Sequence, residues 1–393
     1  MLEHPTAVFQ QIVGWVVTRK HGCARQFRTP KEIAPAAPLT TGARKAVAAP
    51  PYLETGLPSA RRQISYEPTG RHRIVDRIGQ LLKFIDKSKV GIEVAPYHSP
   101  IVSRSDGFQS ISLDIFDADE LRRRAEADPE VPDANVKRIE EVDLQGSAGD
   151  IADLVSAKFG DKRFDYILSS HNFEHLPDPI RFLQGCQQVL ADGGVLSLAV
   201  PDRRFCFDFY RPVTELSEWL DAFHEKRQRP TPGQVFRGTA LRSNLNGGGA
   251  WGALLTPVPT PDENIEDAYA KWQSMQGGTD VEYTDAHCSA FTPASLELML
   301  ADLRFLGLIR LETIEISQPN VFEFYVHLRN VDAAPSSTDT TSFYRNRAEI
   351  MQRAAAEVGN RSPIAWLIHT AGTQVVSTGS RLITAGSRMI SGK

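Results

Sequence analysis

Between about residues 70 and 330, hydrophobic and polar residues follow two alternating patterns. Short apolar runs typical of buried strands alternate with stretches whose apolar residues recur every three or four positions, which is the helical spacing. The predicted strands are 89–95, 110–115, 136–143, 164–170, 193–201, 308–317 and 321–329. The predicted helices are 72–86, 150–159, 178–191 and 291–307. This alternation predicts an α/β protein with a doubly wound, mostly parallel sheet.

Local signals support two of the helices and the last pair of strands. Asp178 and Thr292 are each followed by proline, a combination typical of a helix N-cap and the first helical position. The connector SQPN between the last two strands is too short for a helical crossover. We therefore expect these two strands to form an antiparallel hairpin at the end of the sheet.

Composition divides the chain into three parts. Residues 1–70 are rich in Pro, Ala and basic residues and predict a basic, partly extended leader. The α/β domain is expected at 71–330, with a Pro- and Gly-rich insertion at about 207–263 that is typical of a lid or binding loop. Residues 331–393 are expected to form a linker and a helical tail.

Charge and cysteine content limit the partners and the compartment. The net charge of −4 gives no general attraction to nucleic acid, and we expect no nucleic-acid partner. The basic leader and the arginines of the tail leave open docking on an anionic membrane or a partner enzyme. The four cysteines are far apart, without metal-ligand spacing, so neither disulfides nor a metal site are predicted. No apolar run has membrane-spanning length, and a cytoplasmic location is expected.

Acidic residues follow the first two predicted strands, where parallel sheets bind ligands. Glu93 lies near the end of the first strand and is followed by Val94, Ala95, Pro96 and Tyr97. Asp114 ends the second strand, and a carboxylate there can accept both hydroxyl hydrogen bonds of a ribose. Alternatively, Asp114 is a turn residue that binds no ligand. A nicotinamide-dependent oxidoreductase is excluded because no G-x-G-x-x-G opens a helix.

Histidines supply candidate proton acceptors. His171 and His175 lie in SSHNFEHLPDP (169–179), between a predicted buried strand and a capped helix. A pKa near 6.5 lets a histidine take a proton at neutral pH, as a general base must. Hydrogen bonding to the loop backbone is the alternative for either one. His287, in DAHCSAFTP, is a third candidate, a substrate contact or a plain loop residue.

The segment FDYILSSHNFEHLPDPIRFLQGCQQVLADGGVLSLAVPD resembles class I S-adenosylmethionine-dependent methyltransferases with an EHL motif after the fourth strand. AFTPASLELMLADLRFLGL is similar to the helix that precedes their terminal hairpin. The resemblance covers roughly residues 72–330. It implies a Rossmann-like, seven-stranded methyltransferase fold and S-adenosylmethionine as cofactor. GIEVAPYHSP further resembles an E-I-G-P loop of type 11-like methyltransferases encoded with bacterial polysaccharide-biosynthesis genes.

The cofactor loop departs from the pattern E-x-G-x-G of this family. Ala95 and Tyr97 occupy the two glycine positions, with Pro96 between them. Alanine adds one methyl group and still permits close approach of a ligand, so we expect a functional site. The short run from 98 to 107 leaves little room for the usual first helix, whose N-terminus would assist binding.

The resemblance implies a role for each matching residue. Glu93, Val94, Ala95, Pro96 and Tyr97 would line the methionine part of the cofactor. Asp114 would bind the ribose and Ile115 the adenine, whose edge Asp143 and Leu144 would hold. Ser169, Ser170 and His171 would border the sulfonium. His175 is the first choice for a general base, His171 the second and His287 the third.

Family analogy favours O-methylation of a saccharide or glycan-biosynthesis intermediate. Aromatic and basic residues of the insertion suit a sugar or sugar nucleotide, although a folded surface loop explains them equally well. These residues are Tyr210, Arg211, Arg227 and Trp251. A lipid, quinone or amine acceptor and a non-catalytic scaffold remain alternatives.

Overall fold

A computed structural model describes residues 76–129, 131–252, 258–276, 283–331 and 340–359. The predicted leader and the tail beyond Gly359 lie outside the described residues. In the described part of the chain, no helix is long and apolar enough to cross a membrane.

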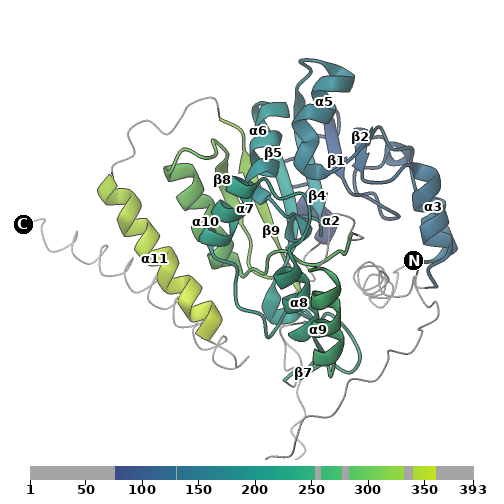
Figure 1. Cartoon of the computed structure of the whole chain (residues 1–393). Coiled ribbons are helices and arrows are strands. Elements are labelled where there is room, and N and C mark those ends of the chain that lie inside the picture. Colours follow the sequence, from purple (N-terminus) through teal and green to yellow (C-terminus); the bar gives the residue numbers. More distant parts are fainter. Residues whose placement is uncertain (1–75, 130, 253–257, 277–282, 332–339, 360–393) are drawn as a thin grey trace, which may run out of the picture. The chain divides into compact units, whose positions relative to one another are not determined.

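Seven strands form one sheet in the order β3-β2-β1-β4-β5-β9-β8 (Figure 1). Their bounds are β1 Val90–Val94, β2 Gln109–Asp114, β3 Leu144–Gln145, β4 Phe164–Ser170, β5 Leu190–Pro201, β8 Glu312–Ile316 and β9 Glu323–Arg329. The pairs among β1 to β5 are parallel, whereas β9 runs antiparallel to both β5 and β8. The predicted fold class and the antiparallel terminal hairpin are thus confirmed.

Ten α-helices are found in the described residues. They are α2 Arg77–Leu81, α3 Ala118–Glu126, α4 Asp133–Val136, α5 Ile151–Phe159, α6 Pro179–Val189, α7 Leu216–Glu225, α8 Pro232–Ala240, α9 Ile265–Ser274, α10 Pro293–Phe305 and α11 Thr340–Gly359. Asp178 caps α6 and Thr292 caps α10, as the sequence signals predict. Thr292 Oγ1 accepts from the amide of Ser295, and Ser295 Oγ accepts in return from the amide of Thr292.

The predicted third strand is wrong. Residues 136–143 form no strand, and the chain joins the sheet only at β3, with the pairs Leu113–Leu144 and Asp114–Gln145. β3 lies at the edge of the sheet, where two residues of pairing suffice. A further small ladder, β6 (Ser243–Asn244) with β7 (Thr260–Pro261), is separate from the main sheet.

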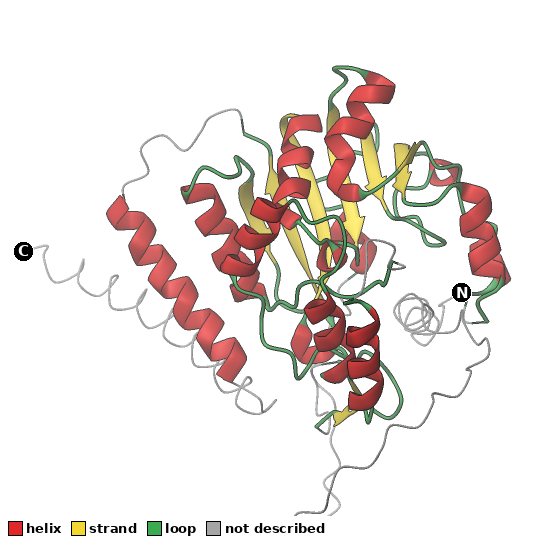
Figure 2. Ribbon diagram, in the orientation of Figure 1, coloured by secondary structure: helices red, strands yellow, loops and turns green. Residues whose placement is uncertain are grey.

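Helices α5, α6 and α10 cover one face of the sheet and enclose the main hydrophobic core (Figure 2). The other face has a smaller cluster, formed by Leu81 of α2, Ile101 and Val102 from the β1–β2 connection, and Tyr166 and Leu168 of β4. That connection contains only the 3₁₀ turn Arg104–Asp106 and no α-helix, as its length predicts. A short loop therefore covers the sheet where a crossover helix is usual.

Helix α11 lies against α10 through paired charges and an aromatic stack. Arg347 forms two hydrogen bonds with Asp302, at 2.8 and 2.9 Å, and Arg353 forms two with Glu297, at 2.7 and 2.8 Å. The rings of Phe305 and Phe343 stack with centroids 3.7 Å apart. Two of the tail arginines considered for docking are thus engaged within the chain.

Candidate active site

The carboxyl ends of β1, β2 and β4 lie side by side. Val94 at the end of β1 is in register with Leu113 of β2 and with Ser169 of β4. The residues that follow these strands therefore meet at one edge of the sheet. This is the place where open parallel sheets bind ligands.

The loop after β1 has the backbone shape of a glycine motif without its glycines. Ala95 has φ 54° and Tyr97 has φ 46°, both in the left-handed region that favours glycine. These are the two positions that glycine holds in E-x-G-x-G. The amide of Ala95 donates to the carbonyl oxygen of Leu113 at 2.8 Å, which holds the loop against β2. Left-handed residues other than glycine cost on the order of 1–3 kcal/mol each and occur where the surrounding structure enforces them.

Glu93 points into the fold beneath this loop. Its two carboxylate oxygens accept hydrogen bonds from the backbone amides of Ile101, at 2.7 Å, and Val102, at 3.1 Å. Burial raises the pKa of Glu93 to about 7, although both amides favour the ionised form. Glu93 thus ties the β1–β2 connection to the sheet from inside.

Asp114 is buried at the end of β2, and its Oδ1 accepts a hydrogen bond from the amide of Ile115 at 2.7 Å. The Ile115 side chain next to it is 46% exposed. An apolar surface beside an acidic strand end suits an adenosine, whose ring stacks while its ribose hydroxyls donate.

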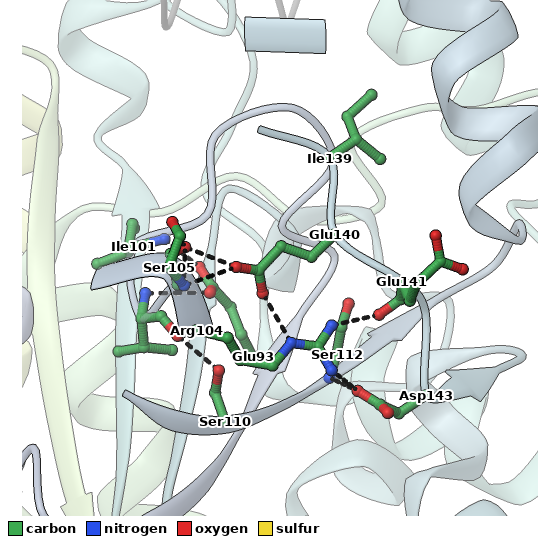
Figure 3. A network of polar contacts seen from close by, with 12 residues as sticks. Glu93, Ile101, Arg104, Ser105, Ser110, Ser112, Ile139, Glu140, Glu141 and Asp143 are labelled. Carbon is green, nitrogen blue, oxygen red and sulfur yellow. Dashed lines mark hydrogen bonds and ion pairs between the residues drawn. The ribbon is translucent and has the colours of Figure 1, made fainter. Parts of the chain in front are cut away.

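Asp143 belongs to a polar network rather than to a strand end (Figure 3). Its Oδ2 accepts from Arg104 Nη1 and from the amide of Ser112, both at 2.9 Å. Arg104 also donates to Glu140 at 3.0 Å. Leu144 is buried in the main core. Leu144 of this predicted adenine pair does not face outward, and the Asp143 side chain, which is 24% exposed, is engaged by Arg104. The residues that follow β3 at this edge are Gly146 and Ser147.

His171 is held in a buried charged network at the end of β4. Its Nε2 lies 2.7 Å from Glu323 on β9, which also accepts from Arg77 Nε at 2.8 Å. Arg77 donates in addition to Ser170 Oγ at 2.7 Å. Burial favours the neutral imidazole, but the carboxylates of Glu174 and Glu323 outweigh it and raise the pKa of His171 to about 9. His171 therefore holds its proton at neutral pH.

The three predicted histidines converge on Glu174, which is completely buried. Its Oε1 lies 3.5 Å from His171 Nδ1, 3.9 Å from His175 Nε2 and 3.9 Å from His287 Nε2. Burial opposes the charge on Glu174, yet the surrounding histidines lower its pKa below the usual range. The rings of His175 and His287 meet edge to face, with centroids 4.6 Å apart.

An aspartate orients each of the two outer histidines. Nδ1 of His175 lies 3.0 Å from Asp285, and Nδ1 of His287 lies 2.5 Å from Asp208. Asp208 also accepts from Arg211 at 2.7 Å. Burial opposes the charge on Asp208, but Arg211 and His287 lower its pKa. Glu174, Asp208 and Asp285 are not among the site residues predicted from the sequence. Only Glu174, within the EHL motif, and Asp285, in DAH, stand beside candidate histidines in the sequence.

Two of the residues considered for the acceptor are structural. Arg211 is 2% exposed and paired with Asp208, and Trp251 is 4% exposed. Tyr210, at 36% exposure, and Arg227 lie nearer the surface, where Arg227 pairs with Glu225 at 2.6 Å. The buried pair cannot stack on a sugar or bind a phosphate in this conformation.

Comparison with known proteins identifies the class. The model of a family described as methyltransferase domain matches residues 66–305, more than half of the chain, and the chain belongs to this family. Family and sheet order together define a class I methyltransferase that uses S-adenosylmethionine. The search of curated proteins gave no match.

Solved structures similar to this chain include three methyltransferases. CcbJ from Streptomyces caelestis is 13% identical, with 64% of this chain and 93% of that chain covered and a TM-score of 0.33. A SAM-dependent methyltransferase from Aquifex aeolicus is 13% identical, with 66% and 92% covered and a TM-score of 0.33. A SAM-dependent methyltransferase from Methanosarcina mazei is 17% identical, with 63% and 95% covered and a TM-score of 0.32.

Proposed function

We propose that this methyltransferase transfers the methyl group of S-adenosylmethionine to a hydroxyl group of a saccharide or glycan-biosynthesis intermediate. One observation carries the cofactor site: the left-handed backbone at Ala95 and Tyr97 beside the buried carboxylate of Asp114. This is the geometry that glycines and an acidic strand end provide in a nucleotide-binding site.

The cofactor supplies a methyl carbon activated by positively charged sulfur. The backbone of residues 94–97 would line its methionine part, with Glu93 supporting the loop from within. Asp114 would accept from the ribose hydroxyls, and Ile115 would contact the adenine. Ser169 and Ser170 would border the sulfonium. Alignment of the acceptor oxygen with the methyl carbon would account for about 7–11 kcal/mol of the barrier.

Removal of the acceptor proton is assigned to His175. The carboxylate of Asp285 at its Nδ1 favours the tautomer with a proton on Nδ1, which leaves Nε2 as the proton acceptor. Asp208 orients His287 in the same way, so His287 is the second choice. His171 becomes the third, because its raised pKa keeps it protonated at pH 7.

Calorimetric titration tests the cofactor site. We expect S-adenosylmethionine and S-adenosylhomocysteine to bind wild-type protein with micromolar Kd. Asp114→Ala should lose this binding, whereas Asp161→Ala, at an exposed residue after α5, should keep it. No binding by the wild type would favour the non-catalytic scaffold.

A second assay tests the acceptor and the base. Methyl transfer from labelled cofactor is measured with saccharide intermediates, and with lipid, quinone and amine acceptors as the alternatives. A hydroxyl acceptor needs a base, so His175→Ala should reduce kcat by about 10²–10⁴-fold with little change in cofactor Kd. Full activity of His175→Ala would favour an amine or carbon nucleophile.

A further inference from the structure

Glu174, His175 and His287 bring one ligand atom each close together; we name these three residues the Glu–His–His cluster. Their ligand atoms all lie within 4.8 Å of one another. Two of the atoms, the Nε2 nitrogens of His175 and His287, are each 3.9 Å from Glu174 Oε1. Two imidazoles and one carboxylate are a ligand set that Zn²⁺ and Fe²⁺ use in enzymes.

Polar atoms of the cluster are buried without a hydrogen-bond partner in the described part of the chain. This applies to both carboxylate oxygens of Glu174 and to Nε2 of His287. Glu174 is 0% exposed and His287 is 5% exposed. A buried carboxylate without hydrogen bonds is costly, and nearly all such groups in proteins have a partner. Distances of 3.5 to 3.9 Å to the histidine nitrogens are too long to supply it.

The surroundings of the two histidines are those of metal ligands. Histidines that bind metals usually donate the other ring N–H to a carboxylate, which fixes the tautomer and turns the lone pair toward the ion. Asp285 stands 3.0 Å from Nδ1 of His175, and Asp208 stands 2.5 Å from Nδ1 of His287. Both Nε2 lone pairs would then face Glu174.

Binding of a metal ion would require the three ligand atoms to move closer together. With metal–nitrogen and metal–oxygen distances of about 2.1 Å, tetrahedral ligands lie about 3.4 Å apart. The two Glu–His distances of 3.9 Å exceed this by about half an ångström. The ligand atoms of His175 and His287 lie within 4.8 Å of each other and would have to approach by up to about 1.4 Å.

We propose that the Glu–His–His cluster binds one divalent transition-metal ion of the zinc class, with an open coordination position toward the acceptor. The sequence predicted no metal, because the ligands come from two segments more than 100 residues apart. Glu174 and His175 lie in the 3₁₀ turn Phe173–His175, which follows β4. His287 lies in the loop before α10.

The role of the ion rests on the proposed function. The cluster follows the end of β4, next to the residues assigned to the sulfonium. An acceptor hydroxyl on the open position would have a lowered pKa and release its proton to water. The resulting oxygen would form the bond to the methyl carbon as the sulfur–carbon bond breaks. With the ion bound, His175 would serve as its ligand, and the role of general base assigned to it above would apply to the metal-free enzyme.

Zinc titration of tag-free, chelator-treated protein tests the site without cofactor or acceptor. We expect one Zn²⁺ per chain by calorimetry and elemental analysis, and the visible absorption of a low-symmetry site with Co²⁺. Glu174→Gln and His287→Ala should each raise the Zn²⁺ Kd at least 100-fold. Asp208→Asn, which keeps all three ligands, should raise it about 10–100-fold.

Matched controls are Glu225→Gln and His224→Ala, at exposed residues of α7, which should bind Zn²⁺ like the wild type. Absence of stoichiometric Zn²⁺ binding by the wild type overturns the proposal, whatever the variants do. Equal affinity of the wild type and Glu174→Gln overturns it as well. Cofactor titration of the metal-free protein is a separate readout, so failure of the metal site and failure of the cofactor site are distinguishable.

Discussion

The buried carboxyl group of Glu93 makes the stability of this protein depend on pH in a specific direction. Burial raises its pKa from 4.5 to about 7. Between these values the folded protein keeps a proton that the unfolded chain has lost, so the free energy of unfolding falls as pH rises. Glu93→Gln removes this titration while keeping the size and one acceptor of the side chain.

The magnitude follows from the two pKa values. At about 1.4 kcal/mol per pKa unit, linkage gives a loss of about 2–3 kcal/mol between pH 5 and pH 8 for wild type relative to Glu93→Gln. The substitution also has a cost that does not vary with pH, about 1–3 kcal/mol, because its NH₂ group faces one of the two backbone amides. Glu93→Gln should therefore be the less stable protein at pH 5 and approach or exceed the wild type at pH 8.

Urea unfolding of both proteins, followed by circular dichroism from pH 5 to pH 8, measures this difference. The comparison cancels the other titrating groups, including His171. Glu126→Gln, at an exposed residue of α3, is the control and should show a difference that is flat with pH. A flat difference for Glu93→Gln would refute the reasoning. It would mean that the amides of Ile101 and Val102 keep the carboxylate ionised despite burial.

Three further substitutions test the fold around the site. Glu323→Gln removes the nearer of the two carboxylates that pair with protonated His171, together with the partner of Arg77, and should cost about 3–5 kcal/mol in urea unfolding at pH 7. A loss below about 1 kcal/mol would contradict this ion-pair network. Gly91→Ala places a methyl group 2.1 Å from the Tyr166 ring and should lower stability by at least about 1–3 kcal/mol, so an unchanged Tm would contradict the tight contact. Thr292→Ala removes the capping box of α10 and should cost about 1 kcal/mol, whereas Thr292→Ser should restore most of it.

The long elements of the sheet could be predicted because their apolar periods are unambiguous. β4 and α6 begin and end within one or two residues of the prediction, since a buried strand and a capped amphipathic helix leave clear patterns. β3 could not be predicted, because a strand of two residues is too short to show an alternation of apolar and polar positions.

The sequence predicts which strand ends carry the candidate site, but not which residues contact its side chains. The ends of predicted parallel strands lead to the expectation that Asp114 and the His171 segment lie at the same edge of the sheet, on either side of β1. They do not show that Glu93 faces inward or that Asp143 binds Arg104, because those orientations depend on the β1–β2 connection. The contacts of His287 with Asp208 and of His171 with Glu323 join segments 79 and 152 residues apart. No local pattern encodes such pairs.

The contacts of helix α11 limit how far the chain can be truncated for expression. The matched family region ends at residue 305, and a chain shortened after β9 would look complete by homology. Such a chain would leave Asp302 and Glu297 without their arginines and expose the ring of Phe305. Glu357 of α11 also accepts a hydrogen bond at 3.0 Å from the amide of Ala294 in the first turn of α10. The smallest portion worth expressing therefore extends to Gly359, because the folding unit is larger than the family's boundary.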